Sequence, residues 1–297
     1  MKLTDPEFIR RLDSLYLLAR KVLGGTLQAD RRSTKKGSGV TFADYSEYYY
    51  GADYRAIDWR VYARFDSLVV KLFELEEDAT IYILVDTSRS MGSADPQGRA
   101  GQKFLYARQL AAAIGYIGLN SLDRVAVYGL GDSLTTLAGV ARGRGKVLPM
   151  LRGLEQAATH PGDTRFNNCC RVFQARHTRR GMVVVLSDFL FPDGFDEGLK
   201  LLGFHGHDVY ALQVQDENDT RCDHKGDALL ECVETGRQKR VTISPKEARA
   251  YERAVEDWNA SLRRCCVRQR IGLASVTPDT PFEQVIRNIL RRGGLVA

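Results

Sequence analysis

Short apolar runs alternate with longer stretches of helical periodicity along most of the chain. From residue 79 onward, runs rich in valine, isoleucine and leucine are each followed by apolar residues at helical spacing. The pattern predicts strands at Ile81–Asp86, Arg124–Leu130, Leu134–Val140, Met182–Asp188, Asp208–Val214 and Gly272–Thr277. It predicts helices at Gly101–Leu119, Val147–Ala157, Asn168–Thr178, Phe195–Phe204, Pro245–Arg270 and Pro281–Arg292. Such alternation is typical of an α/β fold, a mostly parallel sheet with helices on both faces.

The part of the chain before this alternation has a different pattern. Apolar residues at helical spacing predict an amphipathic helix over Asp5–Leu23, and the polar, glycine-containing stretch Gly24–Val40 predicts a mobile loop. The block that follows is dense in aromatic and charged residues and forms either an accessory lobe or an extension of the sheet. We therefore divide the chain into a helix with its loop (1–40), this block (41–78) and the main α/β domain (79–297).

The composition is that of an ordinary globular protein. The chain has 297 residues, of which 44% are hydrophobic, enough for a sizeable core. No stretch approaches the roughly 20 apolar residues of a membrane-spanning helix. The N-terminal segment carries acids and arginines among its apolar residues and therefore differs from a signal peptide. These features predict a cytoplasmic protein.

The basic residues gather in three clusters. Lysines and arginines number 43 against 37 acids, a formal net charge of +6, and cluster at Arg31–Lys36, Arg237–Arg240 and Arg263–Arg270. A nucleic-acid-binding surface would have aromatic residues interleaved with such clusters, and these have none. The clusters fit solvated surfaces or an acidic protein partner better, and nucleic-acid binding stays an alternative.

The six cysteines favour free thiols in a reducing compartment. Cys169-Cys170 and Cys265-Cys266 are adjacent pairs, and neighbouring cysteines rarely bridge each other. Cys222, His224 and Cys232 are a weak zinc alternative, because they lack a paired C-x₂-C spacing and a clear fourth ligand.

Oxygen-bearing side chains stand at the end of the first strand of the main domain. Asp86, Ser88 and Ser90 alternate where the run TIYILVD passes into a loop. Hard divalent cations prefer oxygen ligands, and Mg²⁺ keeps several waters in an octahedral shell. One carboxylate and two hydroxyls would hold Mg²⁺ (or Mn²⁺) and leave room for an outside ligand. In the simpler alternative, the serines only cap the following helix.

The spelling D-x-S-x-S resembles the metal-ion-dependent adhesion site of von Willebrand factor type A domains. That resemblance implies a von Willebrand factor A-like (Rossmann-like) sheet, and a site completed by a Thr from a second loop and an Asp from a third. Thr164 and Asp188 stand at the matching places in chain order. The family usually has Gly just before this Thr, whereas this chain has Asp163, and Thr159 is a nearby competitor.

The upstream block suggests charge pairs framed by aromatic rings. Arg55, Asp58, Arg60 and Arg64 are spaced among tyrosines and the ring of Trp59. We expect Trp59 to be buried, with the block acting either as a structural clamp beside the first strand or as a partner-binding surface.

This block also resembles a bacterial family, "domain of unknown function 58", which is von Willebrand factor A-like. The family typically reads YxxGDDxRxIDWxxxAR, then LxVKxFxxE, then the D-x-S-x-S strand, and this chain has Ala52 in place of the first Asp of the pair. The matching residues are Tyr48, Gly51, Asp53, Arg55, Asp58, Trp59, Arg64 and Lys71. Further on, Glu234-Thr235-Gly236 resembles the family's E-T-G hairpin.

The resemblance implies a binding module. Members of the family are commonly encoded beside MoxR-type AAA+ ATPases, so the implied partner is such an ATPase or its client protein. A metal-dependent hydrolase or phosphotransferase is the enzymatic alternative. An aspartate-nucleophile phosphatase would normally show D-x-D, and the second position is Ser88. We therefore expect no catalytic residues.

Overall fold

The chain forms two compact units. The computed structural model describes residues 2–30, 41–49, 54–74, 80–93, 101–160, 162, 164–222, 225–234 and 236–291. The larger unit comprises the segments 1–20 and 79–297, and the smaller unit comprises 21–78.

A six-stranded sheet lies at the centre of the larger unit, as far as the described residues show, with the strand order β10-β7-β6-β3-β4-β5. Its strands are β3 (Thr80–Asp86), β4 (Arg124–Leu130), β5 (Leu134–Arg142), β6 (Met182–Ser187), β7 (Asp208–Val214) and β10 (Gly272–Val276). Neighbours run parallel except β4 and β5, which are antiparallel. Every residue of β3 is buried, as expected for a central strand covered on both faces. The predicted α/β fold with a mostly parallel sheet is confirmed.

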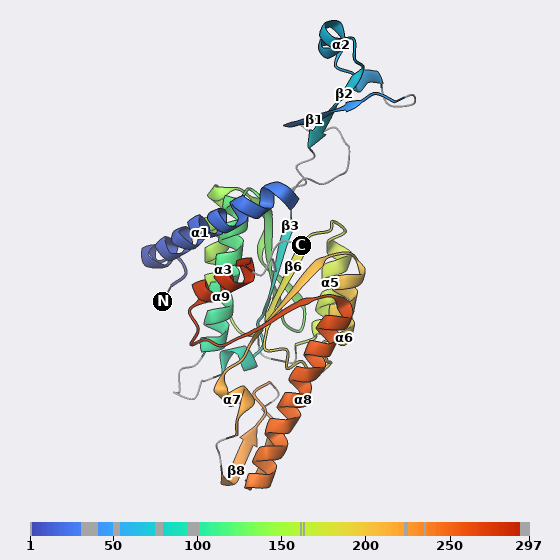
Figure 1. Cartoon of the computed structure of the whole chain (residues 1–297). Coiled ribbons are helices and arrows are strands. Elements are labelled where there is room, and N and C mark those ends of the chain that lie inside the picture. The colour runs from blue at the N-terminus through green and yellow to red at the C-terminus, as the bar shows by residue number, and fades with distance from the viewer. Residues whose placement is uncertain are drawn as a thin grey trace. The chain divides into compact units, whose positions relative to one another are not determined.

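Helices cover both faces of this sheet (Figure 1). Those on one face are α5 (Phe166–Arg176), α6 (Asp196–Phe204) and α8 (Pro245–Gln269); those on the other are α1 (Pro6–Asp30), α3 (Gln102–Asn120), α4 (Val147–Gln156) and α9 (Phe282–Arg291). Alternate β3 residues point to opposite faces: Tyr82 and Leu84 join the core under α5 and α6. On the α3 face, a Cβ added at Gly118 would lie 2.7 Å from Ile81 Cδ1, so glycine permits the close approach of helix and strand.

Helix α1 is longer than the sequence predicts. It continues through Gly24 to Asp30, so the expectation of a loop from residue 24 is wrong; residues 31–40 of that predicted loop lie outside the described residues. Two glycines cost a helix about 1 kcal/mol each relative to alanine, but propagation of an existing helix is favourable and Leu27, Gln28 and Ala29 are good helix formers. Its first turns belong to the larger unit and pack against α9, where the ring centres of Phe8 and Phe282 are 5.4 Å apart.

The smaller unit contains a two-stranded sheet of its own. β1 (Thr41–Glu47) pairs antiparallel with β2 (Val69–Glu74), and η1 (Tyr54–Ala56) and α2 (Trp59–Phe65) lie between them in sequence. Asp58 begins α2: its carboxylate accepts hydrogen bonds from the Arg60 amide and the Tyr45 hydroxyl, both at 3.0 Å. A buried aspartate that caps a helix accounts for its place in the family pattern.

The rings of α2 are exposed, contrary to the expectation from the sequence. Trp59 is 59% exposed and Phe65 is 74% exposed, although Asp58 between sheet and helix is buried. Arg60 and Arg64 are exposed as well. The density of aromatic residues was a misleading sign of burial, because a two-stranded sheet and a helix of two turns offer too little surface to cover the rings of that helix.

We expect Trp59→Ala to change the free energy of unfolding by no more than about 0.5 kcal/mol, because the ring loses little contact. The matched core truncation Phe166→Ala should cost about 3–5 kcal/mol, since Phe166 is fully buried. Urea denaturation followed by circular dichroism measures both. A loss above about 2 kcal/mol for Trp59→Ala would show that the ring is buried in solution.

A hairpin and a short helix follow β7. They are α7 (Glu217–Thr220), β8 (Gly226–Glu231) and β9 (Gln238–Ile243), and the single-turn helices η2 (Ser90–Gly92) and η3 (Arg144–Lys146) complete the elements of the described chain. Ser244 then caps α8 in a capping box with Glu247, with Pro245 at the first helical position. Among the described residues, no helix has the length and apolar character needed to cross a membrane.

Candidate functional site

The oxygen-bearing residues predicted from the sequence lie at the carboxyl end of the sheet. From β3 the chain crosses to β4 on one side, and from β6 it crosses to β7 on the other side. The connections therefore diverge between β3 and β6, which is where open α/β sheets bind ligands. Asp86 ends β3, and Asp188 directly follows β6.

Asp86 is completely buried and held from two sides. Its Oδ1 accepts a hydrogen bond from the Ser88 amide at 2.9 Å, and its Oδ2 accepts one from the Ser187 hydroxyl at 2.5 Å. Ser187 in turn accepts from the Phe189 amide at 2.8 Å. Burial, reinforced by the neighbouring Asp188 carboxylate, raises the pKa of Asp86 to about 7. A proton or a nearby cation would each remove the cost of burying this charge.

The two serine hydroxyls lie side by side on the loop after β3. Ser88 Oγ and Ser90 Oγ are 2.9 Å apart. The loop is fixed by Thr87, whose amide and hydroxyl both donate to the Leu130 carbonyl of β4, at 2.9 and 2.7 Å. The alternative that the serines cap the next helix gains no support. The single-turn helix η2 follows Arg89 and has no side-chain cap bond, and α3 begins at Gln102 after Gly101.

Thr164 lies on a second loop attached to the same strand end. The Arg165 amide donates to the Gly131 carbonyl at 2.9 Å, one residue beyond the carbonyl that holds Thr87. Thr164 is buried, and its hydroxyl has no hydrogen-bond partner among the described residues. The competing Thr159 is only partly buried and lies near η2, where a Cβ on Gly92 would meet its methyl group at 2.9 Å. Thr164 is the more deeply buried of the two threonines.

Asp188 is paired with a buried lysine. Lys103 Nζ lies 3.1 Å from Asp188 Oδ2 and 2.9 Å from both carboxylate oxygens of Asp219. Burial opposes the charge on Lys103, but the carboxylates of Asp188 and Asp219 outweigh it and raise the pKa of the ammonium above its ordinary value. The other oxygen of Asp188, Oδ1, accepts from the Leu190 amide at 3.1 Å.

The turn that carries Asp188 contains a strained residue. Phe189 has φ of 60°, a left-handed conformation that bulky residues rarely adopt. The conformation is held by the bond of its amide to Ser187, by the Trp258 indole, which donates to its carbonyl at 3.0 Å, and by burial of its ring. Strain of this kind persists where the surrounding structure fixes it, often at functional sites. In this turn the Ser187 hydroxyl donates to Asp86 at the end of β3.

The cluster carries an excess of negative charge. When all are ionised, the carboxylates of Asp86, Asp188 and Asp219 outnumber the single ammonium of Lys103 and leave a formal charge of −2. A divalent cation would cancel that charge. The donors are carboxylate and hydroxyl oxygens, which suit Mg²⁺ or Mn²⁺ rather than a soft metal.

Three residues of this neighbourhood escaped the sequence analysis, namely Lys103, Ser187 and Asp219, and Glu234 was singled out there without a place in the site. Lys103 and Ser187 had no signal, because a lysine at a helix start and a serine at a strand end have common structural uses. Glu234 had one, the likeness of its sequence to the family hairpin. Its carboxylate accepts from the Ser90 amide at 2.8 Å and from the Arg89 amide at 3.3 Å.

The zinc alternative gains no support. Cys232 is exposed and Cys222 is partly buried, while His224 lies outside the described residues. Across the described residues, no three His, Cys, Asp or Glu side chains gather as a metal cluster. The set around Asp86 is of another kind, because three of its five members are hydroxyls. Burial raises the pKa of the thiols of Cys169, Cys170, Cys265 and Cys266, so they stay protonated and unreactive.

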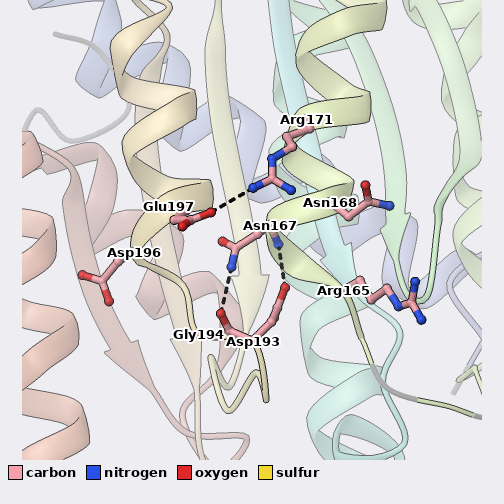
Figure 2. Close-up of a pocket in the computed structure, with 8 residues that line it drawn as sticks. All are labelled: Arg165, Asn167, Asn168, Arg171, Asp193, Gly194, Asp196 and Glu197. Atoms are coloured by element: carbon pink, nitrogen blue, oxygen red, sulfur yellow. Dashed lines mark hydrogen bonds and ion pairs between the residues drawn. The ribbon is translucent and has the colours of Figure 1, made fainter.

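A polar depression of about 470 Å³ lies beside α5 and α6 (Figure 2). Its lining residues are Arg165, Asn167, Asn168, Arg171, Asp193, Gly194, Asp196 and Glu197. The backbone and side-chain amides of Asn167 donate to Asp193, and its side-chain oxygen accepts from the Gly198 amide. Arg171 forms an ion pair with Glu197 at 2.9 Å. These contacts join the β6–α6 connection to α5 and serve the fold.

The family-pattern residues fall in the smaller unit. The Tyr48 amide donates to the Leu68 carbonyl, Asp58 caps α2, and the Arg55 guanidinium lies 5.9 Å from the centre of the Tyr54 ring. Lys71 belongs to β2 and pairs in register with Tyr45. Gly51 and Asp53 lie outside the described residues.

A family model described as "Protein of unknown function DUF58" matches residues 44–261. The chain belongs to this family. An uncharacterized protein of Mycobacterium tuberculosis and one of Mycobacterium bovis are each 26% identical to this DUF58 chain over 296 residues, covering 98% of it and 92% of the relative. An uncharacterized Mycobacterium avium protein is 33% identical over 86 residues, 29% of this chain and 50% of that protein.

Among solved structures, the DUF58 chain is similar to the conserved hypothetical protein BatB from Bacteroides thetaiotaomicron, at 13% identity and a TM-score of 0.41 over 72% of this chain and 98% of that one. It is also similar to an aerotolerance-related membrane protein from Bacteroides fragilis, at 12% identity and a TM-score of 0.43 over 72% of this chain and 97% of that one. The SpRpn10 VWA domain is 13% identical, with a TM-score of 0.38, over 71% of this chain and 94% of that domain. These likenesses are too weak to support a conclusion about function.

Proposed function

We propose that this DUF58 protein is a non-enzymatic, metal-dependent protein-binding module. Mg²⁺ (or Mn²⁺) would be held by Asp86, Ser88, Ser90, Thr164 and Asp188, some directly and some through water. The cation would supply a positive charge to which an aspartate or glutamate of a protein partner binds.

The buried hydroxyl of Thr164 is the observation that carries this proposal. Seven buried side-chain atoms of the described residues have no hydrogen-bond partner, which costs free energy, and the Thr164 hydroxyl is the one among them that belongs to the predicted set of ligands. Ligation of a cation by this oxygen, directly or through water, would remove that cost. The neighbouring carboxyls of Asp86 and Asp188 support the same proposal, because a divalent cation between them would let both stay ionised.

The chain's own residues would prepare the site. Ser187 and the Ser88 amide fix both oxygens of Asp86, and Lys103 with the Leu190 amide fixes both oxygens of Asp188. Such supporting contacts orient ligands and set metal affinity. Position 88, where a phosphatase of the D-x-D type would carry its acid, is a serine, so the site lacks that proton-transfer group. Binding therefore fits these residues better than hydrolysis.

The partner we propose is a MoxR-type AAA+ ATPase or the client protein that such an ATPase remodels. The support is the family membership together with the resemblance in the Asp58–Trp59 block and the D-x-S-x-S strand. The carboxylate-binding role of the cation would require an exposed acidic residue on that partner.

Affinity capture from the native lysate tests the proposal. The tagged protein is incubated with Mg²⁺ or with EDTA, alongside Asp86→Asn and a matched control, Asp208→Asn, which removes a carboxylate at the opposite end of the sheet. We expect mass spectrometry to recover one partner with wild type and Asp208→Asn in Mg²⁺ only. A partner recovered equally well in EDTA, or with Asp86→Asn, would contradict the metal-dependent role.

A further inference from the structure

The turn between β8 and β9 places a carboxylate on the candidate metal loop. Glu234 Oε1 accepts from the Ser90 amide at 2.8 Å, and Oε2 accepts from the Arg89 amide at 3.3 Å. Glu234 lies 144 residues from Ser90 in sequence, so the contact is made by the folded chain and not by a local turn. The carboxylate thus binds the backbone of the same residue whose hydroxyl pairs with Ser88.

The contact adds a carboxylate at the end of the sheet that already carries Asp86 and Asp188. Asp86 and Asp188 lie at this end of the sheet with one buried ammonium, Lys103, between Asp188 and Asp219. A further carboxylate is unfavourable there unless a cation is present. The two backbone amides strengthen their bonds to Glu234 because its carboxylate is charged, but they do not neutralise that charge.

The structure that carries Glu234 is easily displaced. β8 and β9 form a two-stranded sheet separate from the central one, and the side chains of Leu229, Leu230 and Val233 are about half exposed. A hydrogen bond within the turn closes it: the Cys232 amide donates to the Arg237 carbonyl at 2.8 Å. A hairpin of two strands is marginally stable and depends on what it packs against. The turn can therefore leave the loop without disturbing the central sheet.

From these contacts we infer that Glu234 is an internal ligand of the proposed metal site. It takes the place that the carboxylate of a partner would take, and it must leave before an acidic segment of that partner binds. This inference rests on the proposed function, and it adds a regulatory contact to it: the hairpin competes with the partner for the same cation. The partner chemistry it implies is an exposed glutamate or aspartate on a turn.

The test uses the full-length protein, Mn²⁺ as the metal and acetate as the carboxylate probe. Glu234→Ala is compared with wild type and with Glu231→Ala, which removes a carboxylate from the same hairpin where it contacts only Gln238 among the bonds described. Water-proton relaxation measures the Mn²⁺ affinity and the hydration of the bound ion. A further variant, Glu234→Asp, keeps the charge and shortens the side chain.

We expect Glu234→Ala to raise the Mn²⁺ dissociation constant about 10- to 100-fold and to increase the number of water molecules on the bound ion. Added acetate should then displace water from the ion in Glu234→Ala and leave wild type unchanged. Glu231→Ala should match wild type, and Glu234→Asp should resemble Glu234→Ala because the shortened carboxylate does not reach the Ser90 amide.

The possible failures are distinguishable. Equal Mn²⁺ affinity, hydration and acetate response in wild type and Glu234→Ala would overturn the internal-ligand inference and leave the metal site standing. Absence of Mn²⁺ binding by both proteins would overturn the proposed function, and the internal ligand with it.

Discussion

Replacing Lys103 with methionine should lower the free energy of unfolding by about 3–5 kcal/mol in metal-free buffer, the usual cost of breaking a buried ion pair by removing one partner. Methionine preserves the length and volume of the side chain. It leaves the carboxylates of Asp188 and Asp219 without the ammonium that lies 3.1 and 2.9 Å from them. The loss comes from the two uncompensated charges and not from a cavity.

Chemical denaturation in EDTA measures this loss, and Lys146→Met is the matched control. Lys146 is exposed in the single-turn helix η3, so the same substitution there should cost no more than about 0.5 kcal/mol. Adding Asp219→Asn to Lys103→Met should restore part of the stability, because one of the two unpaired charges is then removed. A loss below about 1 kcal/mol for Lys103→Met would mean that the ammonium is not needed to hold these carboxylates.

The central sheet could be predicted from the sequence because its signal is local. The run Ile81–Asp86 is apolar or aromatic at every position before Asp86 and β-branched at half of its positions, and a strand buried on both faces needs that composition. The predicted bounds of β4, β6 and β7 agree with the structure to within a residue. Asp86, Ser88 and Ser90 could be proposed for the same reason, since they follow β3 directly and their spacing is visible in one segment.

The rest depends on contacts between distant parts of the chain. Lys103 is 85 residues from Asp188 and 116 residues from Asp219, so nothing near it in sequence distinguishes it from a solvated lysine. The hydrophobic pattern did not predict the hairpin β8–β9, because most of its residues are exposed and its pattern is weak, and only the family resemblance of Glu234-Thr235-Gly236 pointed to it. Trp59 was misjudged in the opposite direction, because aromatic composition predicts burial only when enough surrounding structure exists to cover the ring.

Asp86→Asn should abolish stabilisation of the protein by Mg²⁺. A ligand that binds only the folded state adds about 2.7 kcal/mol at a concentration 100 times its dissociation constant, and wild type should show a melting temperature that rises accordingly with Mg²⁺. Asparagine keeps an oxygen for the Ser88 amide and a polar group against Ser187, but it lacks the charge that a cation requires. Alanine is the poorer choice, because Asp86 is fully buried rather than at an open rim and its truncation would leave both of those groups unpaired.

In EDTA the same variant should be as stable as wild type or more stable. Burial of the Asp86 carboxylate and its repulsion by Asp188 are unfavourable while no cation is bound, and asparagine removes both costs. The stability curves of the two proteins should therefore cross as Mg²⁺ is added, with Asp208→Asn following wild type throughout.

Differential scanning calorimetry across a Mg²⁺ series measures the crossing. If the melting temperature of Asp86→Asn rises with Mg²⁺ as that of wild type does, Asp86 is not a ligand of the cation. If the melting temperature of wild type does not change with Mg²⁺, the protein does not bind the cation. The two curves cross only if the charge of Asp86 destabilises the metal-free protein and stabilises the metal-bound protein. This is the electrostatic condition that a metal-binding site has to meet.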